Sequence, residues 1–93
     1  MRECEIERKL VDAVKVKGGI CWKFVSPSTA GVPDRIILMP NGRIAFVELK
    51  APGKEMRPLQ VHRKRQLEAL GFRVYCIDMK EQIAEVLHEI QAT

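Results

Sequence analysis

The stretch PDRIILMPNGRIAFVELK, residues 33–50, holds two apolar runs separated by Pro40-Asn41-Gly42. Asn-Gly between two apolar runs is a strong signal for a tight β-hairpin, because both residues tolerate the positive φ that the turn requires. We therefore expect antiparallel strands over residues 35–39 and 43–49. The other elements of the fold lie before and after this hairpin in the chain.

Apolar periodicity and turn-forming residues place the other elements around the hairpin. A stripe of apolar residues three and four positions apart predicts a helix before it, which Gly18-Gly19 ends. A second helix has Pro in its first turn and Gly71 just beyond its end. The expected elements are helices over 3–16, 58–70 and 80–90, strands over 20–25 and 72–77, and a loop over 26–31.

The resulting order, α-β-β-β-α-β-α, predicts the fold class. The helix between the third and fourth strands permits a right-handed crossover, which makes those two strands parallel. Together with the antiparallel hairpin, this gives a mixed four-stranded sheet flanked by helices, an α/β fold.

Length and composition indicate one small domain, which we take to span residues 1–93. No apolar run approaches the ~18 residues that cross a bilayer, and the charged N-terminus lacks the apolar segment of a secretory signal. We therefore expect a cytoplasmic protein with no membrane partner. Three widely spaced cysteines favour reduced thiols over a disulfide framework or a zinc site.

Two acidic residues and a lysine are placed together by the hairpin. Side chains alternate along a strand, so Glu48 and Lys50 share one face. Asp34 begins the partner strand, and the Asn41-Gly42 turn brings it to the same open end as Glu48. Two carboxylates can hold Mg²⁺ together with waters and substrate phosphate oxygens. The alternatives are a surface ion pair for Glu48 and Lys50 and a turn-capping role for Asp34.

Glu7 is a third candidate, because it lies inside the apolar stripe of the first helix. A carboxylate on a core-facing stripe is unusual. Glu7 either reaches the acidic pair or lies at the margin of the stripe, paired with Arg8 or Arg35.

These residues resemble the PD-(D/E)XK nuclease superfamily, through Pro33-Asp34 followed by Glu48-Leu49-Lys50. The resemblance is closer to the VRR-NUC family, the virus-type replication-repair nucleases, and covers nearly the whole chain. The blocks that carry it are Ser26-Pro27, Gly31 to Arg35, Phe46 to Gly53 and Pro58-Leu59-Gln60. The resemblance implies a restriction-endonuclease-like core and a metal-dependent DNA endonuclease.

The resemblance also implies a role for each site residue. Asp34, Glu48 and the Leu49 carbonyl hold Mg²⁺, for which Mn²⁺ can substitute. Lys50 orients or helps to deprotonate the attacking water, and Gln60 supports Lys50 or the water. Glu7 touches the metal through water or holds a second ion, with Glu3 and Glu5 as substitutes.

The basic residues between 50 and 65 fit a phosphate-binding surface, with a solvated helix face as the alternative. The aromatic residues fall within predicted strands, where core packing is expected, so recognition should be of the DNA backbone and not of bases. The predicted DNA-contacting residues are Lys23, Arg35, Lys54, Arg57, Arg63, Lys64 and Arg65.

The family resemblance implies a homodimer that cuts branched DNA such as Holliday junctions, in a bacterial or phage-infected cell. No small-molecule substrate is expected. Three alternatives remain: a catalytically idle DNA-binding module, a structural α/β protein with ordinary ion pairs, and a nuclease that acts on flaps or plain duplex.

Overall fold

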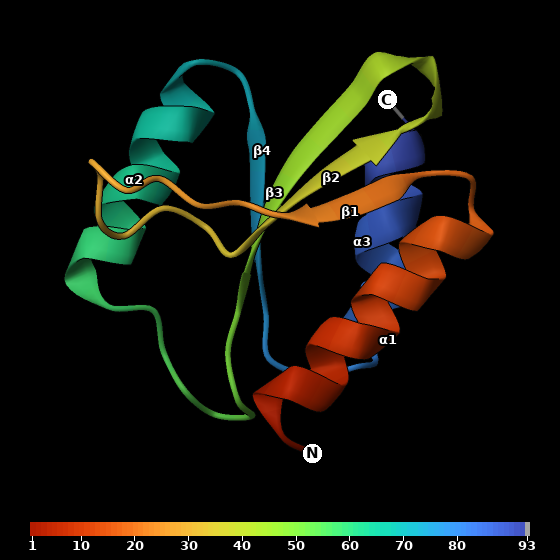
Figure 1. Cartoon of the computed structure of the whole chain (residues 1–93), viewed down its shortest axis with the longest axis horizontal. Helices are drawn as coiled ribbons and strands as arrows, with labels where there is room; N and C mark the ends of the chain where they lie inside the picture. The colour runs from red at the N-terminus through yellow and green to blue at the C-terminus, as the bar shows by residue number, and fades with distance from the viewer. Residues whose placement is uncertain (93) are drawn as a thin grey trace.

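The elements occur in the predicted order in a computed structural model that describes residues 1–92 (Figure 1). Thr93, at the end of the predicted domain, lies outside the described residues. The elements are α1 (Glu3–Val16), β1 (Ile20–Lys23), β2 (Arg35–Met39), a 3-10 turn (Pro40–Gly42), β3 (Arg43–Leu49), α2 (Pro58–Ala69), β4 (Arg73–Ile77) and α3 (Gln82–Gln91).

The four strands form one mixed sheet in the order β1-β2-β3-β4. The hairpin is confirmed, since β2 and β3 pair antiparallel with Ile37 opposite Ala45. Asn41 and Gly42 take φ angles of 69° and 72°, which is why this turn needs those two residue types. The crossover is also confirmed, because β3 and β4, which α2 connects, pair in parallel.

Some element ends differ from the prediction by one or two residues. β1 ends at Lys23, although the backbone N–H of Phe24 still donates to the carbonyl of Asp34 at 2.9 Å. α3 begins at Gln82, whose side-chain Oε1 accepts hydrogen bonds from the backbone N–H groups of Asp78 and Met79. α2 ends at Ala69 and β4 begins at Arg73. Local side-chain hydrogen bonds of this kind are hard to read from periodicity alone.

The main core lies on the sheet face that α1 and α3 cover, while α2 lies on the other side (Figure 1). The apolar stripe of α1 and one face of α3 pack onto alternate residues of the strands, as the alternation of side chains along a strand predicts. The fully buried members include Ile6, Leu10, Ile37, Val47, Leu49, Ile77 and Leu87. No helix within residues 1–92 is long and apolar enough to cross a bilayer.

The second sheet face is only partly covered, because α2 packs mainly against β4. Phe46 contacts Phe24 and Phe72 there, with ring centroids 5.2 and 5.8 Å apart. Trp22 lies on the same face but on the far edge strand, and it is 57% exposed. The expectation that every aromatic residue packs in the core is therefore wrong for Trp22, because alternation sets the face but not what covers it.

Truncation of a core leucine should show how much the α1 face contributes. Leu10→Ala is expected to lower the free energy of unfolding by roughly 2–5 kcal/mol, because Leu10 is fully buried. Urea denaturation measures it, with Val16→Ala as the control on the same helix, since Val16 is 87% exposed. Equal losses in the two variants would contradict this packing of α1.

Candidate active site

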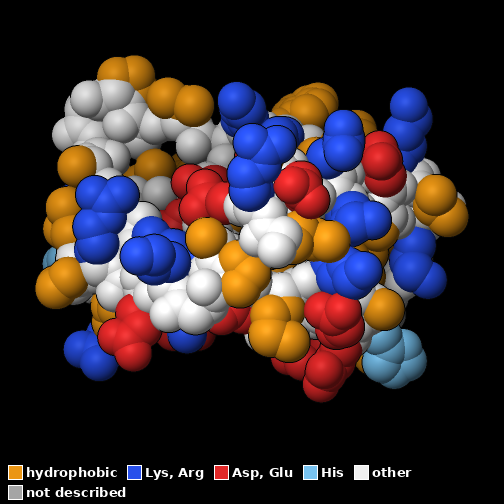
Figure 2. Space-filling view, turned by 90° about the horizontal axis from the view of Figure 1, so that it is seen from below, with side chains coloured by type: hydrophobic (Ala, Val, Ile, Leu, Met, Phe, Trp, Pro, Cys, Tyr) orange, Lys and Arg blue, Asp and Glu red, His pale blue; other side chains and the backbone are white. Residues whose placement is uncertain are grey.

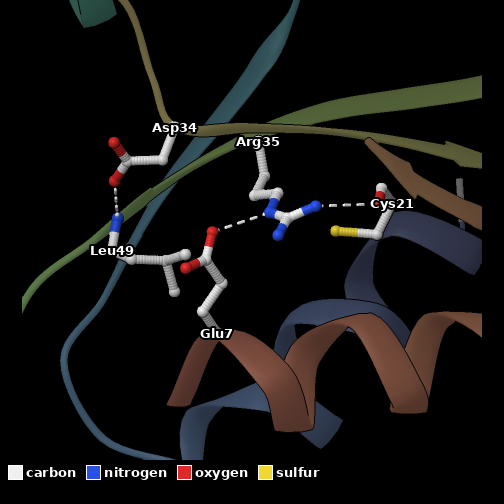
Figure 3. Close-up of polar contacts among 5 residues, drawn as sticks. All are labelled: Glu7, Cys21, Asp34, Arg35 and Leu49. Carbon is white, nitrogen blue, oxygen red and sulfur yellow. Dashed lines mark hydrogen bonds and ion pairs between the residues drawn. The ribbon is translucent and has the colours of Figure 1, made fainter. Parts of the chain in front are cut away.

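Asp34 is held at the start of β2 from two directions. Its backbone carbonyl accepts the N–H of Phe24, and its Oδ2 accepts the backbone N–H of Leu49 at 2.8 Å (Figure 3). In a strand, the N–H and C=O of one residue point to the same edge. The Leu49 carbonyl therefore faces the Asp34 side of β3, as the predicted metal site requires.

Glu48, next to last in β3, is buried with its charge unmatched. Its side chain is 1% exposed, and no donor among residues 1–92 bonds to either of its carboxylate oxygens. Burial raises the pKa of Glu48 to about 8. The adjacent Asp34 carboxylate contributes to this rise, and the charge of Lys50 partly opposes it.

A divalent cation fits this arrangement. An ionised carboxylate without donors is costly inside a protein, and a bound cation removes that cost. Glu48, Asp34 and the Leu49 carbonyl edge supply oxygen atoms only, which are the ligands that Mg²⁺ and Mn²⁺ prefer. Within residues 1–92, no group of three or more His, Cys, Asp or Glu side chains could hold a metal ion.

Lys50 and Gln60 are both anchored by their surroundings. The backbone N–H of Lys50 donates to the carbonyl of Ile77 at 3.0 Å, which continues the β3–β4 pairing beyond the strand. Gln60 lies in the first turn of α2, where its Oε1 accepts the backbone N–H of Arg57 at 2.8 Å. Its carbonyl oxygen is thus used to cap the helix.

Gly31 brings the loop before Asp34 onto the start of α2. It has a φ of +85°, and a Cβ at this position would lie 2.7 Å from the Cγ of Leu59. Only glycine permits this close approach. Gly31 and Val32 consequently line one hollow together with Gln60, so that the loop and the helix meet beside the site.

Glu7 does not point to the acidic pair. Its Oε2 accepts a hydrogen bond from the Nε of Arg35 at 2.8 Å, and the Nη1 of Arg35 donates to the Cys21 carbonyl at 3.2 Å (Figure 3). The alternative in which Glu7 pairs with Arg35 therefore describes the geometry. The Arg35 side chain is only 14% exposed, which leaves little of it for DNA.

Glu3 is the acidic residue of α1 whose charge reaches the site, because it adds to the raised pKa of Glu48. Glu3 precedes Glu7 by one helical turn, and the N-terminus of α1 lies at the same end of the sheet as the chain that leaves β3 (Figure 1). The i−4 spacing placed the two residues on one face of the helix. Which turn lies level with Glu48 depends on how α1 docks.

The predicted DNA-contacting residues divide into anchored and exposed groups. Arg63 donates to the Ala30 carbonyl at 2.8 Å and to Gln66 at 2.9 Å, so it holds the loop against α2. Lys64 forms a partly exposed ion pair with Glu68 at 3.8 Å. Figure 2 shows the N-terminal end of the molecule, where acidic side chains lie between groups of Lys and Arg side chains. The exposed residues are Lys23, Lys54, Arg57 and Arg65.

Comparisons with known proteins agree with this fold and motif pattern. No family model matches the chain. A solved structure named "VRR_NUC domain" superposes with a TM-score of 0.86 and 22% identity, covering 92% of this chain and 94% of that one. The fold is therefore that of a VRR-NUC domain.

The sequence comparison is more specific. Over 81 residues the chain is 48% identical to "Putative nuclease p44" of Acyrthosiphon pisum secondary endosymbiont phage 1, covering 87% of each protein. The chain belongs to the family of this phage protein, and its VRR-NUC fold agrees with the resemblance found in its motifs.

The buried charge predicts a pH dependence of stability without metal. Because the pKa of Glu48 is raised on folding, the folded state retains a proton between pH ~4.5 and ~8 that the unfolded state has lost. The contribution of Glu48 to the free energy of unfolding is complete below pH ~4.5 and is lost as the pH rises to about 8. Glu48→Gln, which carries no charge, should raise the metal-free Tm at pH 8.5 by more than about 4 °C, and by less at pH 5.

Thermal unfolding followed by circular dichroism in EDTA measures this difference. Added Mg²⁺ should raise the Tm of the wild type and leave Glu48→Gln nearly unchanged. Equal Tm values for the two proteins at pH 8.5 would show that Glu48 is not an unmatched buried charge.

Proposed function

We propose that the chain is a metal-dependent DNA endonuclease, with Asp34, Glu48 and Lys50 as its central catalytic residues. The observation that carries the proposal is the buried Glu48 carboxylate, which lies beside Asp34 and has no donor in the described part of the chain. An ordinary structural protein gains nothing from such a costly group. Membership of a nuclease family supports the same conclusion.

Hydrolysis of a phosphodiester needs an activated water and stabilisation of negative charge on the phosphate. Asp34, Glu48 and the Leu49 carbonyl would hold a divalent ion, which would lower the pKa of a bound water and neutralise charge on the phosphate. Lys50 places a fixed positive charge where the phosphate gains negative charge. Gln60 orients Lys50 or the attacking water from the first turn of α2. Glu3 is the further carboxylate of the site.

DNA is held through its backbone in this proposal. Exposed cations close to the site in sequence, Lys54, Arg57 and Arg65, supply sequence-independent contacts to phosphates. Lys23 adds a positive charge on the edge strand. Mg²⁺ is the proposed physiological ion, and Mn²⁺ has the same preference for oxygen ligands.

The proposed substrate is branched DNA such as a Holliday junction, cut by a homodimer to leave a 5′-phosphate. Two active sites related by a two-fold axis suit two opposed strands. The phage origin of the 48% identical relative supports action in the cytoplasm of a bacterial or phage-infected cell.

Variants of the central residues test the activity. Asp34→Asn should abolish cleavage of a labelled four-way junction, and Lys50→Ala should lower kcat by roughly 10²–10³-fold. Lys17→Ala is the matched control, since Lys17 is exposed at the far end of α1. Cleavage is measured with Mg²⁺, with Mn²⁺ and with EDTA, on junction, flap, duplex and single-stranded DNA.

The outcomes separate the alternatives. Binding of the junction without cleavage under either metal would leave a DNA-binding module, and faster cleavage of flaps or duplex would replace the proposed substrate. If neither Asp34→Asn nor Lys50→Ala altered any nucleic-acid property, the nuclease proposal would be wrong.

Oligomeric state is tested separately by analytical ultracentrifugation. We expect a dimer at micromolar concentration, and a loss of junction cleavage on dilution below the dissociation constant of the dimer. A monomer that retains full junction cleavage would contradict the homodimer.

A further inference from the structure

We propose that Glu7 and Arg35 form a positioning pair that fixes Asp34 in the active site, and that neither residue touches metal or DNA. The two side chains are joined by a hydrogen-bonded ion pair of 2.8 Å between residues 28 positions apart in the chain. Arg35 directly follows Asp34, so any movement of Arg35 is transmitted to Asp34 through one peptide bond. The inference rests on the proposed function only for its effect on activity.

The pair ties three elements together at the start of β2. Glu7 belongs to α1, Arg35 to β2, and the Cys21 carbonyl that accepts from Arg35 to β1. The Asp34 and Arg35 side chains leave the chain in different directions, one toward Leu49 and the other toward Glu7 (Figure 3). Arg35 therefore anchors the strand from the core face while Asp34 serves the site.

The anchor acts on Asp34 because few other contacts hold its side chain. The hydrogen bond from the Leu49 N–H to Oδ2 sets the orientation of the carboxylate. Without Glu7, the Arg35 guanidinium would be a largely buried charge without its counter-ion. It would move toward water, which would shift the start of β2 and lengthen the bond between Asp34 and Leu49.

Direct roles fit the two residues less well. Two acceptors bind the guanidinium of Arg35 from the protein side, and its side chain is 14% exposed, so little of it is accessible to a phosphate. The negative charge of Glu7 is neutralised by Arg35, which weakens its attraction for a cation. The charge of Glu3, one helical turn before Glu7, contributes to the raised pKa of Glu48.

Amide hydrogen exchange tests the pair without reference to activity. Glu7→Ala should lower the protection of the Leu49 amide roughly tenfold, because that amide bonds to Asp34, while the amide of Ala45 in mid-β3 keeps its protection. Glu7→Gln, which retains an acceptor, should show a smaller loss. Glu5→Ala is the control, since Glu5 pairs only with the exposed Arg2 at 3.3 Å.

Unchanged protection of Leu49 in Glu7→Ala, or an equal loss at Ala45, would overturn the inference. The second outcome would mean that the pair stabilises the fold as a whole. If Glu7→Ala does not fold, Glu7→Gln and Arg35→Lys provide the same comparison. Because this readout needs neither metal nor DNA, failure of the nuclease proposal would leave it intact as a test.

Cleavage kinetics then distinguish positioning from contact. A positioning pair predicts that Glu7→Gln, Arg35→Lys and the double variant all lower kcat by a similar factor, roughly 10-fold, because residues of one unit are not additive. The Mg²⁺ concentration for half-maximal rate should rise with unchanged KM for DNA. An increase in KM with a weaker salt dependence in Arg35→Lys would instead show that Arg35 contacts phosphate.

Discussion

The Glu48 carboxylate lies inside the protein with no hydrogen-bond donor from residues 1–92, and the rest of the site is arranged around it. Burial, together with the adjacent Asp34 carboxylate, raises its pKa to about 8. Ionisation of Glu48 at neutral pH therefore needs a positive partner. Lys50 offsets part of the repulsion, and the oxygen-rich surroundings leave the remainder to a divalent cation.

The sheet imposes this geometry. Antiparallel pairing of β2 with β3 brings Asp34 to the backbone of Leu49, and parallel pairing of β3 with β4 anchors Lys50 on Ile77. The α1 and α3 core on one face leaves the opposite face to Glu48 and α2. The site is therefore built on paired strands, whose backbone positions are more closely defined than those of loops.

Two acidic residues of α1, Glu3 and Glu7, lie one helical turn apart and have different partners. Glu3 acts on the site through its charge, while Glu7 is used by Arg35. Arg63 is likewise held in a structural contact, with the Ala30 carbonyl. Several charged residues that the sequence suggests for DNA or metal thus have protein partners in the folded structure, whereas cations such as Lys54 and Arg57 are exposed.

The sequence by itself determined the order of elements, the hairpin around Asn41-Gly42 and the joining of Asp34, Glu48 and Lys50, because these follow from local periodicity, turn chemistry and strand alternation. Only the tertiary structure decided that Trp22 is exposed and that Glu7 binds Arg35. It also decided that the charge of Glu3 contributes to the raised pKa of Glu48. Those outcomes depend on how α1 and α2 dock against the sheet. Helical periodicity indicates which face of a helix is buried, but not which of its turns lies level with a given strand residue.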